Sequence, residues 1–200
     1  PEHGRMIVST MGLELLRANY AYIPGYPSSG NIRAAVISGE VNIATDAAHA
    51  YLNQVVPVLV EPGTGLPIFS MPVLNGDGEL VKNTMVPGVA SLPELYEALH
   101  GLPPAGIAWD AIETMIEIDQ TMQHVFLGPP GMEGSRADLF RTGLENAMRS
   151  EAYQAEARRV HSYVPQVIDH QRQAEIFAAS SEVPPKVLDY IEAHIARNSR

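Results

Sequence analysis

The sequence contains no cysteine and no long hydrophobic run. Without thiols the chain can form no disulfide framework, no cysteine-based zinc site and no cysteine nucleophile. A membrane-spanning helix needs about 18 or more consecutive apolar residues, and no stretch of the sequence has this length. A fold stabilised by disulfides and a chain that crosses a membrane are therefore both unexpected.

Positive charge is also scarce. The chain has 13 Lys and Arg residues against 23 Asp and Glu residues, which gives a formal net charge of -10. A nucleic-acid-binding surface needs a basic face, so we expect no nucleic-acid partner. A local site can still bind an anion, because backbone N–H groups and helix dipoles act at short range.

The signatures of metal, nucleotide and nucleophile chemistry are missing as well. The seven histidines form no His-x-His or His-Glu-x-x-His spacing, so no metal site is expected. No Gly-x-Ser-x-Gly elbow is present to expose a serine nucleophile. Gly63-Thr64-Gly65 and Gly76-Asp77-Gly78 lack the continuation of a nucleotide-binding fingerprint. We therefore expect no cofactor and no catalytic residues.

The most informative stretch predicts a strand, a sharp loop, a helix and a second strand. Residues 20–23 are mostly β-forming, and Pro24-Gly25 ends the predicted strand. A helix is predicted over residues 32–39, and the second strand over residues 40–45. Because a helix connects the two strands, we expect them to be parallel.

The rest of the sequence predicts further helices and a few extended segments. Apolar spacing and capping residues predict helices over residues 2–16, 46–52, 91–101, 109–118, 135–148, 151–160, 169–180 and 184–197. Extended segments are predicted over residues 67–74 and 122–127, a turn over 75–78, and a compact β-branched run covers 55–60. Together these elements predict an α/β fold with a helix-rich C-terminal third.

The loop before the helix at 32–39 has the composition of an anion site. Ser28, Ser29 and Asn31 are all good N-cap residues for this helix. A strand that breaks at a glycine and leads into a helix leaves N–H groups free, and the positive end of the helix dipole favours a carboxylate there. The alternative is an ordinary βαβ turn with a solvated cap, and spacing alone leaves both open.

Several segments, in this order, resemble one family. They are the Gly25–Ser29 loop, the Ser38–Val41 segment, Pro129-Pro130-Gly131, the Ser150–Ala157 segment and Val183–Val187. The chain resembles the extracytoplasmic solute-binding receptors of tripartite tricarboxylate transporters, also called Bug-type periplasmic binding proteins. The resemblance extends from about residue 2 to residue 197.

The resemblance implies a class II periplasmic-binding-protein-like α/β fold with two lobes. Residues 1–110 would form the second lobe with its ligand-facing loop, and residues 111–200 a return strand and C-terminal helices associated with the first lobe and hinge. The chain begins at Pro1 without an initiator Met or a signal-peptide pattern, so we expect a trimmed polypeptide that lacks the N-terminal part of the first lobe. Apolar surface left by that part would favour a homodimer.

The resemblance also implies a ligand and the residues that hold it. Such receptors bind a carboxylate through backbone N–H groups and small hydroxyls. Asp46 would lie at the same edge of the sheet, although it equally suits the N-cap of the next helix. The implied ligand-binding residues are Tyr26, Ser28, Ser29, Gly30, Asn31, Thr45 and Asp46.

The expected function is that of a periplasmic receptor that captures a small organic carboxylate and delivers it to membrane permease subunits. One alternative is an α/β enzyme in which Asp46 and His49 act as an acid–base pair, which requires the two side chains to share one site. A second alternative is a receptor-like interaction module that acts without transport.

Overall fold

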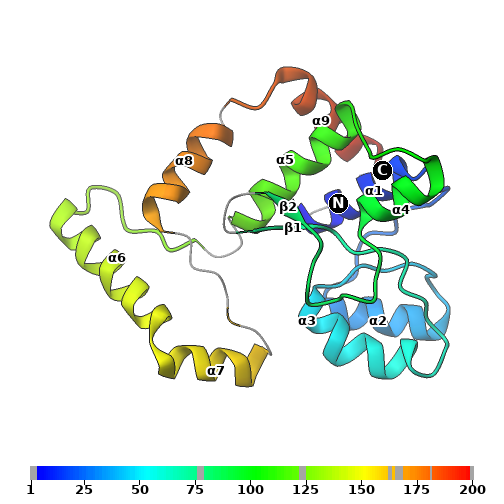
Figure 1. Cartoon of the computed structure of the whole chain (residues 1–200), viewed down its shortest axis with the longest axis horizontal. Helices are drawn as coiled ribbons and strands as arrows, with labels where there is room; N and C mark the ends of the chain where they lie inside the picture. Colours follow the sequence, from blue (N-terminus) through cyan, green and yellow to red (C-terminus); the bar gives the residue numbers. More distant parts are fainter. Residues whose placement is uncertain are drawn as a thin grey trace. The chain divides into compact units, whose positions relative to one another are not determined.

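The computed structural model describes residues 4–75, 79–121, 125–161, 164, 169–180 and 182–198. Contacts divide the chain into two compact units (Figure 1). Unit 1 comprises Pro1–Gln120 and Val183–Arg200, and unit 2 comprises Thr121–Glu182. The assignment of residues 1–110 and 111–200 to two lobes of a receptor stays a prediction.

Helices dominate the part of the chain that the structure describes, with 60% of residues in helices and 3% in strands. The two strands, β1 (Val73–Leu74) and β2 (Leu80–Val81), pair antiparallel. An isolated parallel bridge joins Ser70 to Ser91. The predicted α/β fold of the periplasmic-binding-protein class is therefore wrong, because the described residues form no parallel sheet for helices to cover.

The helices of unit 1 largely follow the sequence prediction. They are α1 (Gly4–Leu15), α2 (Ser29–Ser38), α3 (Ala48–Ala50), the π-helix η1 (Tyr51–Val60), α4 (Leu92–His100), α5 (Ile107–Thr121) and α9 (Pro185–Asn198). The last residue of α5 lies across the boundary of unit 2. The predictions of helices near α1, α2, α4, α5 and α9 are confirmed.

Helix α4 begins and ends where its sequence predicts. Ser91 Oγ accepts a hydrogen bond from Glu94 N at 3.4 Å, and Ser91 N donates to Glu94 Oε2 at 2.7 Å. This reciprocal pair is the predicted capping box. At the other end Gly101 has a φ of 76°, a left-handed conformation that glycine adopts without strain.

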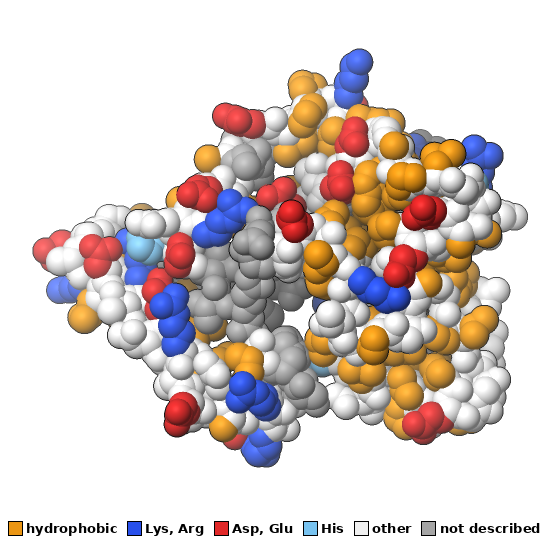
Figure 2. Space-filling model, viewed as in Figure 1, with side chains coloured by type: hydrophobic (Ala, Val, Ile, Leu, Met, Phe, Trp, Pro, Cys, Tyr) orange, Lys and Arg blue, Asp and Glu red, His pale blue; other side chains and the backbone are white. Residues whose placement is uncertain are grey.

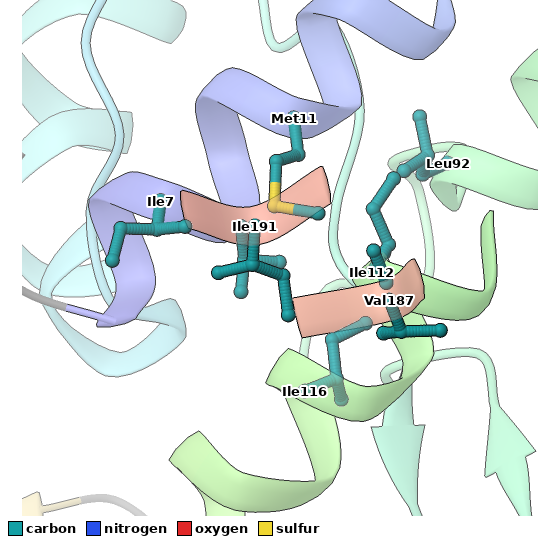
Figure 3. Packing of buried hydrophobic residues seen from close by; sticks show 9 residues of the cluster. Ile7, Met11, Leu92, Ile112, Ile116, Val187 and Ile191 are labelled. Atoms are coloured by element: carbon teal, nitrogen blue, oxygen red, sulfur yellow. The ribbon is translucent and has the colours of Figure 1, made fainter. Parts of the chain in front are cut away.

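The core of unit 1 lies between α1, α5, α9 and the start of α4 (Figure 3). Apolar residues four apart share one face of a helix, as Ile7 and Met11 do on α1 and Val187 and Ile191 on α9. Figure 3 shows Met11, Val187 and Ile191 in the region between the helices, near Ile112 of α5. The buried cluster consists of Ile7, Val8, Met11, Leu92, Ala111, Ile112, Ile116, Val187 and Ile191. The C-terminal helix thus completes a core that the N-terminal helix begins.

The predicted strands around α2 are wrong. Residues 20–23 and 40–45 form no strand, so α2 does not connect a parallel pair. The β-branched run 55–60 lies in the π-helix η1, which contains Pro57. The bond from Glu61 N to Val56 O, 2.9 Å long, has the five-residue spacing of a π-helix. A β-forming composition was not sufficient, because a strand also needs a partner.

The segment that carries α2, α3 and η1 buries few side chains. Its buried residues are Ala35, Ala50 and Leu59. Larger apolar side chains remain in contact with solvent, such as Ile37, which is 58% exposed. Figure 2 shows hydrophobic side chains across the surface of unit 1. This segment is therefore held more by polar contacts than by burial.

Unit 2 contains three helices among its described residues. They are α6 (Gly134–Arg149), α7 (Glu151–His161) and α8 (His170–Ser180), close to the predicted ranges. The predicted cap of α6 is wrong: Glu133, rather than Ser135, occupies the N-cap position, and its side chain makes no capping hydrogen bond. α6 buries none of its residues, and its Leu139 side chain is 72% exposed.

Two predicted features fall partly outside the described residues. These are the turn at 75–78, of which residues 76–78 are not described, and the strand at 122–127, of which residues 122–124 are not described. Residues 125–127 form no strand. Of the helices in the described ranges, none combines the length and apolar character that crossing a membrane requires.

Candidate functional site

The N-terminus of α2 lies at the predicted Gly-Tyr-Pro corner, defined here as residues 25–31. Ser28 is the N-cap, with the extended backbone that N-caps adopt (φ -157°, ψ 161°). Its Oγ accepts a hydrogen bond from Asn31 N at 3.3 Å and donates one to Asn31 Oδ1 at 2.6 Å. The predicted capping role is confirmed, and it occupies the side chains of both Ser28 and Asn31.

The corner is exposed and retains free donors. Gly25 has a φ of 100°, in the left-handed region that favours glycine, and residues 27–31 are all exposed. Within the part of the chain that the structure describes, the amides of Ser29 and Gly30 have no hydrogen-bond partner. First-turn amides have no acceptor inside their own helix, and the helix dipole adds a partial positive charge there. The corner can therefore donate two backbone hydrogen bonds to an anion.

Tyr26 connects the corner to the far end of α2. Its phenol donates a hydrogen bond to Glu40 Oε1 at 2.7 Å. This bond, with smaller contributions from desolvation and from the charge of Glu40, raises the pKa of Tyr26 above its usual value. Glu40 follows Gly39, which ends α2 in a left-handed conformation. The phenol proton of Tyr26 is thus directed at Glu40, while its ring borders the corner.

Thr45 and Asp46 contact protein groups. Thr45 Oγ1 accepts a hydrogen bond from Ser9 Oγ of α1 at 3.0 Å. Asp46 forms an ion pair with Arg33 of α2 through Oδ2, and its Oδ1 accepts the amide of Ala47 at 3.0 Å. The alternative prediction that Asp46 caps the next helix is wrong, because Ala47 holds the N-cap position of α3. Their roles in ligand binding stay predictions.

Arg33 is the residue that sequence reasoning missed. It bridges α2 to two other segments, because it also donates a hydrogen bond to Gln54 Oε1 of η1. Its Nη2 lies 3.9 Å from the position that a Cβ on Gly30 would occupy, so the guanidinium is close to the corner. One signal was available: Arg33 is the sole Lys or Arg between Arg17 and Lys82.

The proposed acid–base partners Asp46 and His49 are both partly buried. The two carboxylate oxygens of Asp46 already accept hydrogen bonds from Arg33 and from the Ala47 amide. A general base needs a lone pair directed at the proton it removes, and these bonds compete for that role. The enzymatic alternative stays a prediction.

No family model, curated protein or solved structure matches the chain. Among the residues that the structure describes, no group of three or more His, Asp or Glu side chains is placed to hold a metal ion. The geometry of the corner, its amides and its nearby guanidinium is therefore the basis for a functional proposal.

Proposed function

We propose that this chain is an extracytoplasmic solute-binding receptor that captures a small organic carboxylate at the corner formed by residues 25–31. The single observation that carries this proposal is the exposed start of α2, where the amides of Ser29 and Gly30 have no partner in the described part of the chain. A carboxylate supplies the two acceptor oxygens that such donors need.

Three further features make the corner favourable for negative charge. The N-terminus of α2 supplies the positive end of a helix dipole. The hydroxyl of Ser29 is exposed next to the free amides. The guanidinium of Arg33, which pairs with Asp46, lies close to Gly30. Hydrogen bonds to a charged group contribute about 1.5–3 kcal/mol each.

The predicted site residues divide into three groups in this proposal. Ser29 and Gly30 would donate directly to the ligand, and Tyr26 would border it with its ring. Ser28 and Asn31 would act by capping α2 and holding its first turn in place. Thr45 and Asp46 would act without touching the ligand, since Asp46 positions Arg33.

The partners and location in the proposal come from the resemblance to receptors of tripartite tricarboxylate transporters. The chain would act in the periplasm and deliver its carboxylate to membrane permease subunits. The supporting observation is the order of the matching segments, from Gly25–Ser29 to Val183–Val187.

Calorimetry with the purified chain tests the proposal. Mono-, di- and tricarboxylates should bind, and the matching amides, which lack the negative charge, should not. If no carboxylate binds below millimolar concentration, the receptor proposal fails.

A substitution at Ser29 tests the corner itself. Ser29→Pro removes one amide donor and the hydroxyl, yet proline suits the first helical position and Ser28 already has the extended backbone that precedes proline. We expect the carboxylate to bind about tenfold more weakly or worse. The matched control Ser29→Ala keeps the amide and should lose less affinity. Equal affinity in all three proteins would exclude the corner as the binding site.

A further inference from the structure

A fully buried histidine joins the first and last helices of unit 1, at residues that the proposed carboxylate site does not use. His194 of α9 is 0% exposed and lies against Thr10 and Glu14 of α1. A buried imidazole needs partners for both ring nitrogens, because an unsatisfied polar atom in the interior is costly. The neighbours of the two nitrogens therefore indicate which protons the ring carries.

The Thr10 hydroxyl requires a proton on Nε2 of His194. Thr10 Oγ1 lies 2.8 Å from Met6 O and 3.0 Å from Ile7 O, and both carbonyl oxygens only accept. The single hydroxyl proton is thus directed at these carbonyls. Nε2 lies 2.7 Å from the same Oγ1, so the ring nitrogen must donate to the hydroxyl.

The carboxylate beside Nδ1 favours a second proton on the ring. Nδ1 lies 3.1 Å from Glu14 Oε2, and the two atoms are at ion-pair distance without the alignment of a hydrogen bond. A bare nitrogen lone pair at this distance from a carboxylate would be repelled, whereas an N–H is attracted. A ring with protons on both nitrogens is an imidazolium, which pairs with the Glu14 carboxylate.

The other charged and titratable groups around the pair come from α9 and from the residues after α1. Arg197 Nη2 also contacts Glu14 Oε2, at 3.0 Å. Asn198 Nδ2 lies 3.5 Å from Nε2 but donates to the His194 carbonyl oxygen at the shorter distance of 3.0 Å. Tyr20 donates to Glu14 Oε1 at 3.4 Å, from the segment that follows α1.

The shifts of the neighbouring Tyr20, Tyr190 and Glu14 move their pKa values away from neutral pH. Burial, and then the charge of Glu14, raises the pKa of both Tyr20 and Tyr190. For Glu14, partial burial acts to raise the pKa, but His194 and Arg197 outweigh it, and its pKa lies below the usual value. α5 packs on α9 through apolar residues such as Ile112 and Ile116, and the pKa of its partly buried Glu113 is raised by burial and by Asp110.

We propose that Thr10, Glu14 and His194 form a proton-dependent latch between α1 and α9, and that loss of the second imidazole proton weakens the attachment of α9. Because α9 supplies Val187 and Ile191 to the core, loosening it would expose apolar residues of α1 and α5. The latch would let the pH of the surroundings control the integrity of unit 1.

Urea unfolding of the full chain at about pH 6 and about pH 8.5 tests the latch, because a proton-dependent contact must give different stabilities under the two conditions. Trp109, the sole tryptophan, packs against the core and reports its unfolding by fluorescence. We expect the wild-type midpoint to fall by about 0.5 M or more from the lower to the higher pH. His194→Gln should lose most of this difference, while His100→Gln, at an exposed histidine of α4, should keep it.

Nitrogen NMR of the wild-type chain, labelled at histidine, tests the same proposal without a variant that could fail to fold. At about pH 6 the buried ring should carry protons on both nitrogens. Its signal is identified as the histidine signal that moves most in Glu14→Gln, because Glu14 is the counter-charge of the ring. A bare nitrogen on this ring at the lower pH, or an unchanged pH difference in His194→Gln, would overturn the latch.

Discussion

Two clusters of charged side chains in unit 1 use the same kinds of groups in different surroundings. In one, Arg33 of α2 contacts Asp46 and Gln54 within a segment that buries few residues. In the other, Glu14 contacts His194 and Arg197 beside the apolar core. The first cluster lies next to an exposed helix start with free amides, and the second contains a fully buried ring.

The difference between the clusters separates two uses of charge. The side chains of Arg33 and Asp46 are 19% and 10% exposed, and they lie in a segment with few buried apolar residues. Those of Glu14 and Arg197 are 26% and 53% exposed, and the group of the second cluster from which water is excluded is the His194 ring, where a lost partner is more costly. We therefore propose that the segment around α2 serves binding, and that the contact between α1 and α9 serves stability with a response to pH.

The largest effect should come from the core itself. Met11 is 0% exposed, and Met11→Ala leaves a cavity between α1, α5 and α9. We expect a loss of about 3 kcal/mol in unfolding free energy, measured by urea titration with Trp109 fluorescence. The matched control Ile37→Ala, at a side chain that is 58% exposed on α2, should cost far less. Similar losses in both variants would remove the contrast between the two regions.

The next largest effect should come from Glu14. Glu14→Gln removes the charge that pairs with His194 and Arg197, and we expect a loss of about 2 kcal/mol near neutral pH. Because the folded pKa of Glu14 lies below its usual value of 4.5, its charge stabilises the fold above that pH. This stabilisation is lost as the pH falls through the folded pKa.

On acidification, Glu14→Gln should therefore lose less of its unfolding free energy than the wild type loses. Urea midpoints measured from neutral pH down to about pH 3 give both curves. Asp46→Asn is the matched control at the other cluster. Parallel curves for wild type and Glu14→Gln would contradict the expected coupling.

A smaller effect separates the two helix caps. Ser91→Ala removes the capping box of α4, whose first residue Leu92 is fully buried, and should cost about 1 kcal/mol in unfolding free energy. Ser28→Ala removes the cap of exposed α2 and should change global unfolding less. Its effect should instead appear as faster amide exchange in the first turn of α2, because an exposed helix can open locally. Slower or unchanged exchange there would show that Ser28 is not needed to hold the corner.

The helices could be predicted because their determinants are local. Ser91, Glu94 and Gly101 specify both ends of α4 within ten residues of sequence, and hydrogen bonds inside each helix join near neighbours. The extended segment predicted over residues 67–74 contains β1, whose partner β2 follows a few residues later in the chain. The strands expected at 20–23 and 40–45 did not form, because a strand depends on a partner that the local sequence does not specify. Residues 20–23 have the composition of a strand but pair with no strand in the described part of the chain, and residues 55–60 lie in a π-helix instead.

In the candidate site too, local features could be predicted from the sequence and long-range contacts could not. Ser28 as the N-cap follows from its place before the helix, and the exposed amides of Ser29 and Gly30 follow from that cap. The contacts of Arg33 with Asp46 and Gln54 join three segments and leave no regular spacing in the sequence. The same is true of His194, which lies 184 residues from its Thr10 partner.

The smallest effect concerns the hydrogen bond between Tyr26 and Glu40, which lies at the surface. Because this bond raises the pKa of Tyr26, Glu40→Gln should let the phenol ionise at lower pH. Tyrosinate absorbance measured against pH, with the curve of Tyr26→Phe subtracted, isolates this group from the other tyrosines. Glu61→Gln, at another exposed carboxylate of unit 1, should leave the curve unchanged. If Glu40→Gln also leaves it unchanged, the phenol proton is not committed to Glu40, and Tyr26 becomes a direct donor to a bound carboxylate.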